Sequence, residues 1–167
     1  MIEIERKFLI DSDKIPSITV HEYEHIIQAY PDWDFGNVIY RLRAIRHCLV
    51  ENDKLQKIEY VQGIKGKSSD ARLENEIELS ISQFKALSPL CKYAIEKQRY
   101  KLLTKDKKYI IDLDYYLNEL SGLIVAEVEF KTIEQRDAYV PESWFGLDVT
   151  KDDRYSNYTL AKDGKTF

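Results

Sequence analysis

Apolar and polar side chains alternate along most of this chain. Eight segments follow a period of two residues, are rich in Ile, Val, Tyr and Leu, and are separated by polar or glycine-bearing breaks. Such alternation is typical of β-strands whose two faces lie in different surroundings. The predicted strands span residues 2–10, 21–30, 38–46, 56–65, 73–80, 95–103, 108–116 and 122–130.

Helical signals are few. The segment 80–90 offers Ser82 as an N-cap, with apolar positions at helical spacing behind it. The segment 131–141 contains Thr132 followed three residues later by Gln135, which is the spacing of a capping box. Each segment predicts one short helix.

The remaining signals complete the predicted fold. Residues 11–17 favour a turn or short helix, and residues 154–161 a closing helical turn. We therefore expect a single domain over residues 1–167 with a β-dominated α+β fold. Eight antiparallel strands favour a tunnel-like β-barrel with a few flanking helices, because closure removes exposed sheet edges.

Composition excludes several classes of protein. The chain has 167 residues, enough for one sizeable core, and a net charge of −4, which argues against a nucleic-acid partner. No apolar run approaches the roughly 18 residues that span a bilayer, so no membrane association is expected. Cys48 and Cys91 lie far apart and predict reduced thiols in a cytoplasmic protein rather than a zinc site or a disulfide framework.

Charged residues recur on one face of seven predicted strands. Residues i and i+2 share a face of a strand, and the charges are segregated, so that some strands present basic side chains and others acidic ones. The first strand presents Glu3, Glu5 and Lys7, the basic positions that follow are Arg41, Arg43, Lys65, Lys97 and Arg99, and the acidic ones are Glu74, Glu76, Glu78, Asp112, Asp114, Glu127 and Glu129.

A solvated sheet face is the simplest explanation of any one such motif, because antiparallel sheets commonly have one wet face. Segregation of sign by strand and the scarcity of Ser and Thr at these positions favour the interior of a barrel instead. A barrel of about eight strands can hold a small ligand, and unpaired charges in a dry lumen are costly. A polyphosphate with a divalent metal would supply both signs of charge.

The ordered set of motifs resembles the CYTH superfamily, the triphosphate tunnel metalloenzymes. The stretches "IEIERKFL", "RLR", "EKQRY", "AEVEF" and the terminal "WFGLDVTKDDRYSNYTLA" are most similar to the short bacterial members. The resemblance covers essentially the whole chain. It implies an eight-stranded antiparallel tunnel and a metal-dependent phosphoanhydride hydrolase that uses Mg²⁺ or Mn²⁺.

The resemblance also implies roles for individual residues. Metal ligands would be Glu3, Glu5, Glu127 and Glu129, and the catalytic set would be Glu3, Glu5, Lys7 and Glu129. The triphosphate would be bound by Lys7, Arg41, Arg43, Lys65, Lys97, Arg99 and Arg154. Supporting acidic residues would be Glu74, Glu76, Asp112 and Asp114. The chain departs from its relatives at Asp153, where short members often carry a basic residue, which leaves the chemistry of that end open.

Inorganic triphosphate is the predicted substrate, because the chain shows no extra domain and no clear base-recognition segment. A class IV-type adenylyl cyclase and a thiamine triphosphatase are the alternatives, and Tyr30, Trp33 or Trp144 could provide the aromatic platform that thiamine would need. A non-catalytic polyphosphate- or nucleotide-binding module would keep the basic residues and lose the metal carboxylates, all of which are present. A monomer or homodimer is expected.

Overall fold

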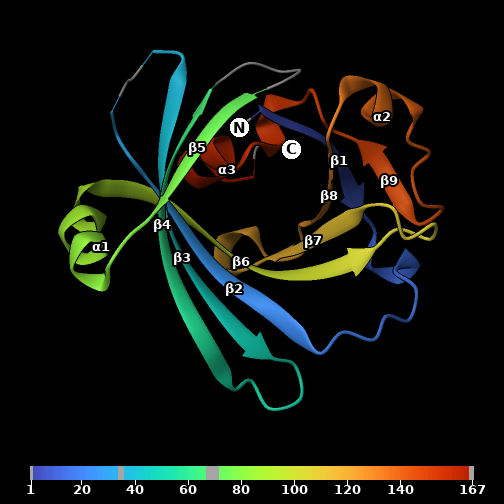
Figure 1. The fold of residues 1–167 in the computed structure, drawn as a ribbon, viewed down its shortest axis with the longest axis horizontal. Helices are drawn as coiled ribbons and strands as arrows, with labels where there is room; N and C mark the ends of the chain where they lie inside the picture. Colours follow the sequence, from blue (N-terminus) through green and yellow to red (C-terminus); the bar gives the residue numbers. More distant parts are fainter. Residues whose placement is uncertain (1, 34–35, 67–71, 166–167) are drawn as a thin grey trace.

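The computed structural model describes residues 2–33, 36–66 and 72–165. Within these ranges nine antiparallel strands form one sheet that closes into a ring (Figure 1). The strands are β1 (Ile2–Ile10), β2 (Glu22–Pro31), β3 (Val38–Leu49), β4 (Leu55–Gly66), β5 (Arg72–Glu78), β6 (Cys91–Leu103), β7 (Ile110–Tyr116), β8 (Ile124–Phe130) and β9 (Phe145–Asp148). The helices are α1 (Ile81–Leu87), α2 (Ile133–Ala138) and α3 (Asn157–Asp163), and short 3₁₀ turns lie at 12–14, 88–90, 118–120 and 153–155.

The edge of β1 closes the barrel. The sheet order is β5-β4-β3-β2-β6-β7-β8-β1-β9, and β1 also pairs with β5. The start of β1 meets β5, with Ile2 opposite Leu73, whereas its end meets β9, with Ile10 opposite Phe145. The predicted eight-stranded antiparallel barrel is thus confirmed, and β9 lies outside the ring as an additional strand that the sequence pattern did not predict.

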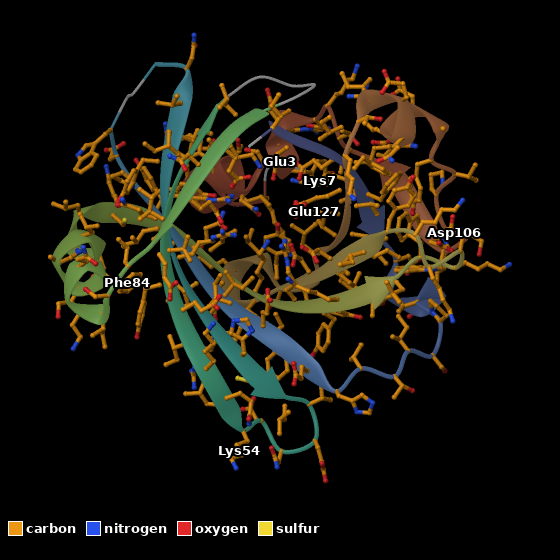
Figure 2. The ribbon with its side chains drawn as sticks, viewed as in Figure 1. Glu3, Lys7, Lys54, Phe84, Asp106 and Glu127 are labelled. Atoms are coloured by element: carbon orange, nitrogen blue, oxygen red, sulfur yellow. The ribbon has the colours of Figure 1, made fainter. Side chains whose placement is uncertain are left out.

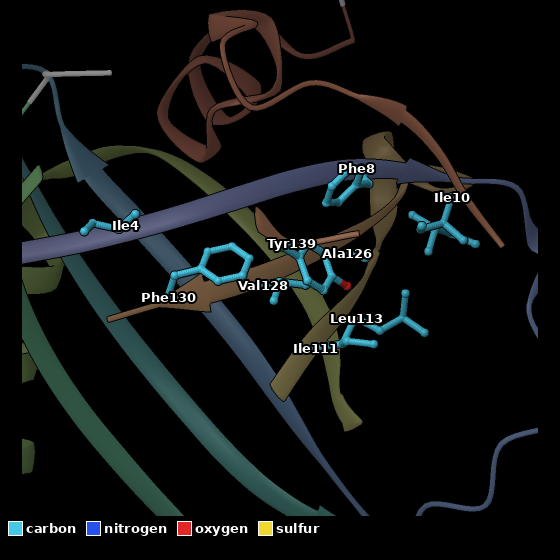
Figure 3. Packing of buried hydrophobic residues seen from close by; sticks show 10 residues of the cluster. Ile4, Phe8, Ile10, Ile111, Leu113, Ala126, Val128, Phe130 and Tyr139 are labelled. Carbon is cyan, nitrogen blue, oxygen red and sulfur yellow. The ribbon is translucent and has the colours of Figure 1, made fainter. Parts of the chain in front are cut away.

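Alternation along β1 separates two environments. Ile4, Phe8 and Ile10 point outward into a hydrophobic cluster with residues of β7 and β8, including Val128 and Phe130 (Figure 3). Phe8 is only 1% exposed. Residues of α2 and β9 and their neighbours cover this outer face, which leaves the charged face of β1 directed into the ring.

A second apolar cluster lies on the inner side of the strands. Ile95, Tyr116 and Val125 pack there against Tyr155 and Leu160, which belong to the C-terminal segment. Leu160 is 2% exposed. The segment that contains α3 is therefore anchored inside the barrel outline, as Figure 1 shows.

The helix boundaries correct one prediction. Ser80, not Ser82, caps α1: its hydroxyl accepts a hydrogen bond from the Gln83 backbone while the Gln83 side chain bonds to the Ser80 backbone. This reciprocal capping box satisfies two otherwise unpaired N–H groups two residues earlier than predicted. Thr132 caps α2 as expected.

The expectations about membranes and thiols have outcomes within the described ranges. No helix there is both long enough and apolar enough to cross a bilayer. Cys48 and Cys91 are both free thiols, and Cys48 is buried.

The close approach of β9 to β1 predicts a stability effect at Gly146. A Cβ at this position would lie 2.6 Å from the Leu9 carbonyl oxygen, a backbone atom that cannot move aside cheaply. We expect Gly146→Ala to lower the free energy of unfolding by about 1–3 kcal/mol, measured by urea denaturation. Gly66→Ala is the matched control, because its Cβ would meet only ordinary contacts at 3.7 Å. Equal stability of the two variants would contradict this packing.

Candidate active site

The barrel encloses a cavity of about 1280 Å³, and all eight strands of the ring contribute to its wall. Figure 2 shows Glu3, Lys7 and Glu127 inside the ring, whereas Lys54 and Phe84 lie outside it. A volume of this size exceeds what a small anion needs and leaves room for bound ions and water.

Most predicted site residues meet in this cavity. Its wall includes Glu3, Glu5, Lys7, Arg41, Arg43, Lys65, Glu74, Glu76, Lys97, Arg99, Asp112, Glu127 and Glu129. Asp114 lies behind the wall and is fully buried. Arg154 is not among the wall residues; its side chain is 56% exposed and binds Asp152. The structure therefore brings the predicted set together except at Arg154, and the individual roles stay predictions.

Strands β6 and β7 form the most buried ionic network. Arg99 stands directly opposite Asp114, and its Nε and Nη2 donate to that carboxylate at 2.6 and 2.7 Å. Arg99 also donates to Asp112 at 2.6 Å and to Glu127 at 2.8 Å. Lys97 donates to Asp114 at 2.5 Å. One buried carboxylate thus holds two cationic side chains in fixed positions.

Burial sets the ionisation of this network. Removal from water lowers the pKa of Lys97, the neighbouring Arg99 lowers it further, and Asp114 opposes both effects. Burial would also lower the pKa of Arg99, but Asp114, Asp112 and Glu127 outweigh it and leave that pKa well above its usual value. Lys97 is therefore the cation of this pair that titrates more readily.

Strands β3 and β5 are joined by charge across β4. Arg41 donates to Glu74 and, at 2.5 Å, to Glu76, and Arg43 also donates to Glu76. Gly63 lies between them: a Cβ there would stand 3.3 Å from Arg41 Nε and 3.4 Å from Glu76 Oε1. The glycine leaves space for the pairing over the intervening strand. Burial would lower the pKa of Arg41, but Glu74 and Glu76 raise it overall.

Side chains of β1 form ion pairs with strands on both sides of it in the ring. Lys7 Nζ lies 2.9 Å from Glu127 Oε1, and Lys65 forms an ion pair with Glu3. Burial would raise the pKa of Glu127, but Lys7, Lys97 and Arg99 hold it well below its usual value. Glu127 is thus ionised throughout the range in which proteins normally work.

Four further carboxylates gather around Glu129. Partial removal from water raises the pKa of Glu129, and Glu3, Asp112, Glu5 and Glu127 raise it further by repulsion. A divalent cation would relieve this repulsion, and carboxylate oxygens are the ligands that Mg²⁺ and Mn²⁺ prefer. The donor chemistry therefore fits such a metal. Among the described residues, however, no three His, Cys, Asp or Glu side chains are already arranged to hold a metal.

Comparison with known proteins decides the family. No family model matches the chain. The chain is 33% identical to an inorganic triphosphatase of Nitrosomonas europaea, over 96% of its length and 97% of that protein. It belongs to the CYTH superfamily of triphosphate tunnel metalloenzymes. A second relative, an inorganic triphosphatase of Acetivibrio thermocellus, is 29% identical over 96% of this chain and 94% of its own length.

Solved structures place the CYTH chain among similar folds. The crystal structure of the inorganic triphosphatase NE1496 has a TM-score of 0.64 and 32% identity, and the match covers 95% of this chain and 93% of that one. A putative adenylyl cyclase from Hippeastrum shares the fold, with a TM-score of 0.54, 14% identity and coverage of 99% and 97%.

The sequence pattern did not indicate several wall residues of this CYTH chain, among them Gln28. Gln28 lines the cavity beside Tyr30, which was named above only as a possible aromatic platform; the two are 1% and 2% exposed, and the Gln28 amide donates a hydrogen bond to the Tyr30 hydroxyl. Burial raises the pKa of Tyr30 to about 12, so its hydroxyl stays neutral. A glutamine within the apolar stripe of β2 was the available signal. Asn157 and Tyr158 also line the cavity, and nothing in the alternation pattern indicated them.

The buried network predicts a pH effect of Asp114→Asn. Asp114 opposes the lowering of the Lys97 pKa, so its neutralisation lowers that pKa further. Lys97 is predicted to bind triphosphate in its charged form, and on that prediction we expect the alkaline fall of kcat/KM to begin at a lower pH. Steady-state kinetics across the alkaline range check this. Asp112→Asn is the control, because Asp112 binds Arg99 and no ion pair between Asp112 and Lys97 is seen among the described residues. If kcat/KM of Asp114→Asn falls at the same alkaline pH as that of the wild type, the predicted effect is wrong.

Proposed function

We propose that this CYTH chain hydrolyses inorganic triphosphate to pyrophosphate and orthophosphate, with Mg²⁺ or Mn²⁺ as cofactor. The observation that carries the proposal is the cavity wall, where six basic side chains from four strands surround one space together with the carboxylates beside Glu129. Both curated relatives described above are named inorganic triphosphatases, which supports the same substrate.

The basic side chains bind and orient the substrate. Arg41, Arg43 and Lys65 come from the β3–β4 side of the ring, and Lys7, Lys97 and Arg99 come from β1 and β6; all of them line the cavity. Charge-assisted hydrogen bonds to phosphate oxygens are about twice as strong as neutral ones. Their existing carboxylate partners hold these groups in position, so little reorganisation is needed when a polyanion enters.

Glu3, Glu5 and Glu129 would hold the metal, with Glu127 beside them. A divalent metal supplies positive charge to phosphate oxygens and lowers the pKa of a bound water. Glu3 and Glu127 are at present bonded to Lys65 and Lys7. Because a polyphosphate would compete for these two lysines and for Arg99, which also binds Glu127, its arrival would release both carboxylates toward a metal.

The reaction needs an attacking water on a terminal phosphoryl group. The water oxygen forms the new P–O bond, the bridging P–O bond breaks, and its electron pair leaves with pyrophosphate while the water proton passes to solvent. The wall cations stabilise the charge that accumulates on the leaving oxygen. We therefore attribute most of the catalysis to positioning of the substrate and to electrostatic stabilisation of the developing charge.

The alternatives predict different products. An adenylyl cyclase would convert ATP into a cyclic nucleotide and pyrophosphate, and a thiamine triphosphatase would prefer thiamine triphosphate. We place the enzyme in the cytoplasm, because its two free cysteines suit a reducing compartment.

One assay distinguishes the substrates: equal amounts of triphosphate, ATP and thiamine triphosphate, with orthophosphate, pyrophosphate and cyclic nucleotide measured separately. The highest kcat/KM on triphosphate, with equal amounts of both phosphates released, is expected; cyclic nucleotide, or binding without turnover, would overturn the proposal.

The proposal predicts a large effect at Glu5. This residue lies in the cavity wall, and its charge contributes to the raised pKa of Glu129. We expect Glu5→Gln to lower kcat on triphosphate by about 10²- to 10³-fold at saturating Mg²⁺, the range typical for loss of one electrostatic stabiliser. Glu119→Gln is the control, because Glu119 is exposed outside the cavity. Wild-type kcat in a folded Glu5→Gln protein would exclude Glu5 from catalysis.

A further inference from the structure

The two ends of the cavity differ. Strand β7 runs from Ile110 to Tyr116, a distance of about 20 Å at the usual rise per residue. Ile110 lines the cavity at one end together with Lys108 and Tyr109, whereas Tyr116 donates a 2.5 Å hydrogen bond to Asn157 at the other. The start of α3 therefore stands at the end of the cavity opposite the Lys108 side.

Residues 156–158 form the wall at the α3 end. Ser156, Asn157 and Tyr158 are consecutive, all line the cavity, and all are also partly exposed to solvent. These three residues, called the barrier below, therefore form part of the cavity wall at the α3 end.

The barrier is held firmly. Tyr155 and Leu160, which flank it, are 5% and 2% exposed and pack in the inner apolar cluster. The Tyr158 ring meets the buried Tyr30 ring edge-on at 5.4 Å between centroids, and the Lys162 ammonium lies 5.9 Å from the Tyr158 ring centroid. Displacing the segment would expose this apolar surface, so it is a fixed wall rather than a surface loop resting on the opening.

The opposite end carries positive charge. Lys101, Lys108 and Lys131 line the cavity there and are exposed. Side chains that are long, charged and solvated accommodate additional anionic groups more readily than a packed aromatic wall does. A substrate that extends beyond three phosphates therefore has room on the lysine side and none on the α3 side.

We propose that Tyr158, with Ser156 and Asn157, is the specificity-determining wall that excludes an organic group attached to the phosphate at the α3 end. This inference rests on the proposed function, since it concerns the choice among triphosphate compounds in the same cavity. A nucleoside attached to the phosphate at the α3 end would collide with Tyr158.

Affinity measurements test the wall without requiring turnover. Calorimetry in metal-free buffer gives the dissociation constants of inorganic triphosphate and ATP for wild type, Tyr158→Ala, Tyr158→Phe and Tyr109→Ala. We expect Tyr158→Ala to narrow the preference for triphosphate over ATP by at least about 10-fold, the usual consequence of enlarging a pocket. Tyr158→Phe keeps the aromatic ring and should keep the wild-type ratio of the two dissociation constants. Tyr109→Ala enlarges the cavity only at the lysine end and should leave that ratio unchanged.

The outcomes separate the two proposals. An unchanged ratio in folded Tyr158→Ala, or an equal change in Tyr109→Ala, overturns the wall. Absence of hydrolysis by a wild-type protein that binds triphosphate overturns the proposed function while the affinity ratios still decide the wall. If Tyr158→Ala fails to fold, Tyr158→Leu replaces it, because a branched aliphatic side chain keeps apolar contact with Tyr30 while shortening the barrier.

Discussion

Charge inside this barrel is stable because basic and acidic strands are placed within reach of one another. Arg99 and Lys97 on β6 meet Asp114 on β7, and Lys7 on β1 meets Glu127 on β8. Isolated buried charges would cost several kcal/mol each and would change their protonation instead. The order of strands around the ring is therefore also an order of charge, and the proposed substrate site depends on it.

Closure of the ring makes this arrangement possible. Only because β1 reaches β5 does Lys65 on β4 come within bonding distance of Glu3. The same edge of β1 later binds β9, which helps to seal the outer apolar face. The strand that carries the first predicted metal ligands thus also carries the junction of the sheet, so its alternation has to satisfy a hydrophobic exterior and a charged interior at once.

The sequence predicted what alternation alone determines. The eight barrel strands, their charged faces and the convergence of residues such as Glu3, Arg41 and Lys97 followed from period-two patterning and from the family resemblance. Side-chain partners did not, because pairing depends on register: Arg41 meets Glu74 from two strands away, across Gly63. Full burial of Asp114 and the position of Arg154 outside the cavity wall likewise depend on three-dimensional packing.

The packing of the C-terminal segment likewise could not be predicted from the sequence pattern. Tyr155 and Leu160 had no visible partners in the sequence, since their apolar contacts are made with inward residues of distant strands. Strand β9 is four residues long, which is too short for a periodic signal, and among the described residues it pairs with the edge of β1 alone. Elements that exist only because a larger surface is already present leave little trace in local patterns.

The central claim is that the cavity binds a polyphosphate, so that the folded protein binds this ligand and the unfolded chain does not. The most direct test is the free energy of unfolding in urea, with and without inorganic triphosphate, in metal-free buffer. At a free concentration 100 times the dissociation constant, the account predicts a stabilisation of about 2.7 kcal/mol, which disappears when Arg41 and Lys97 are both replaced by alanine. Absence of any stabilisation of the wild-type protein at millimolar triphosphate would contradict the claim.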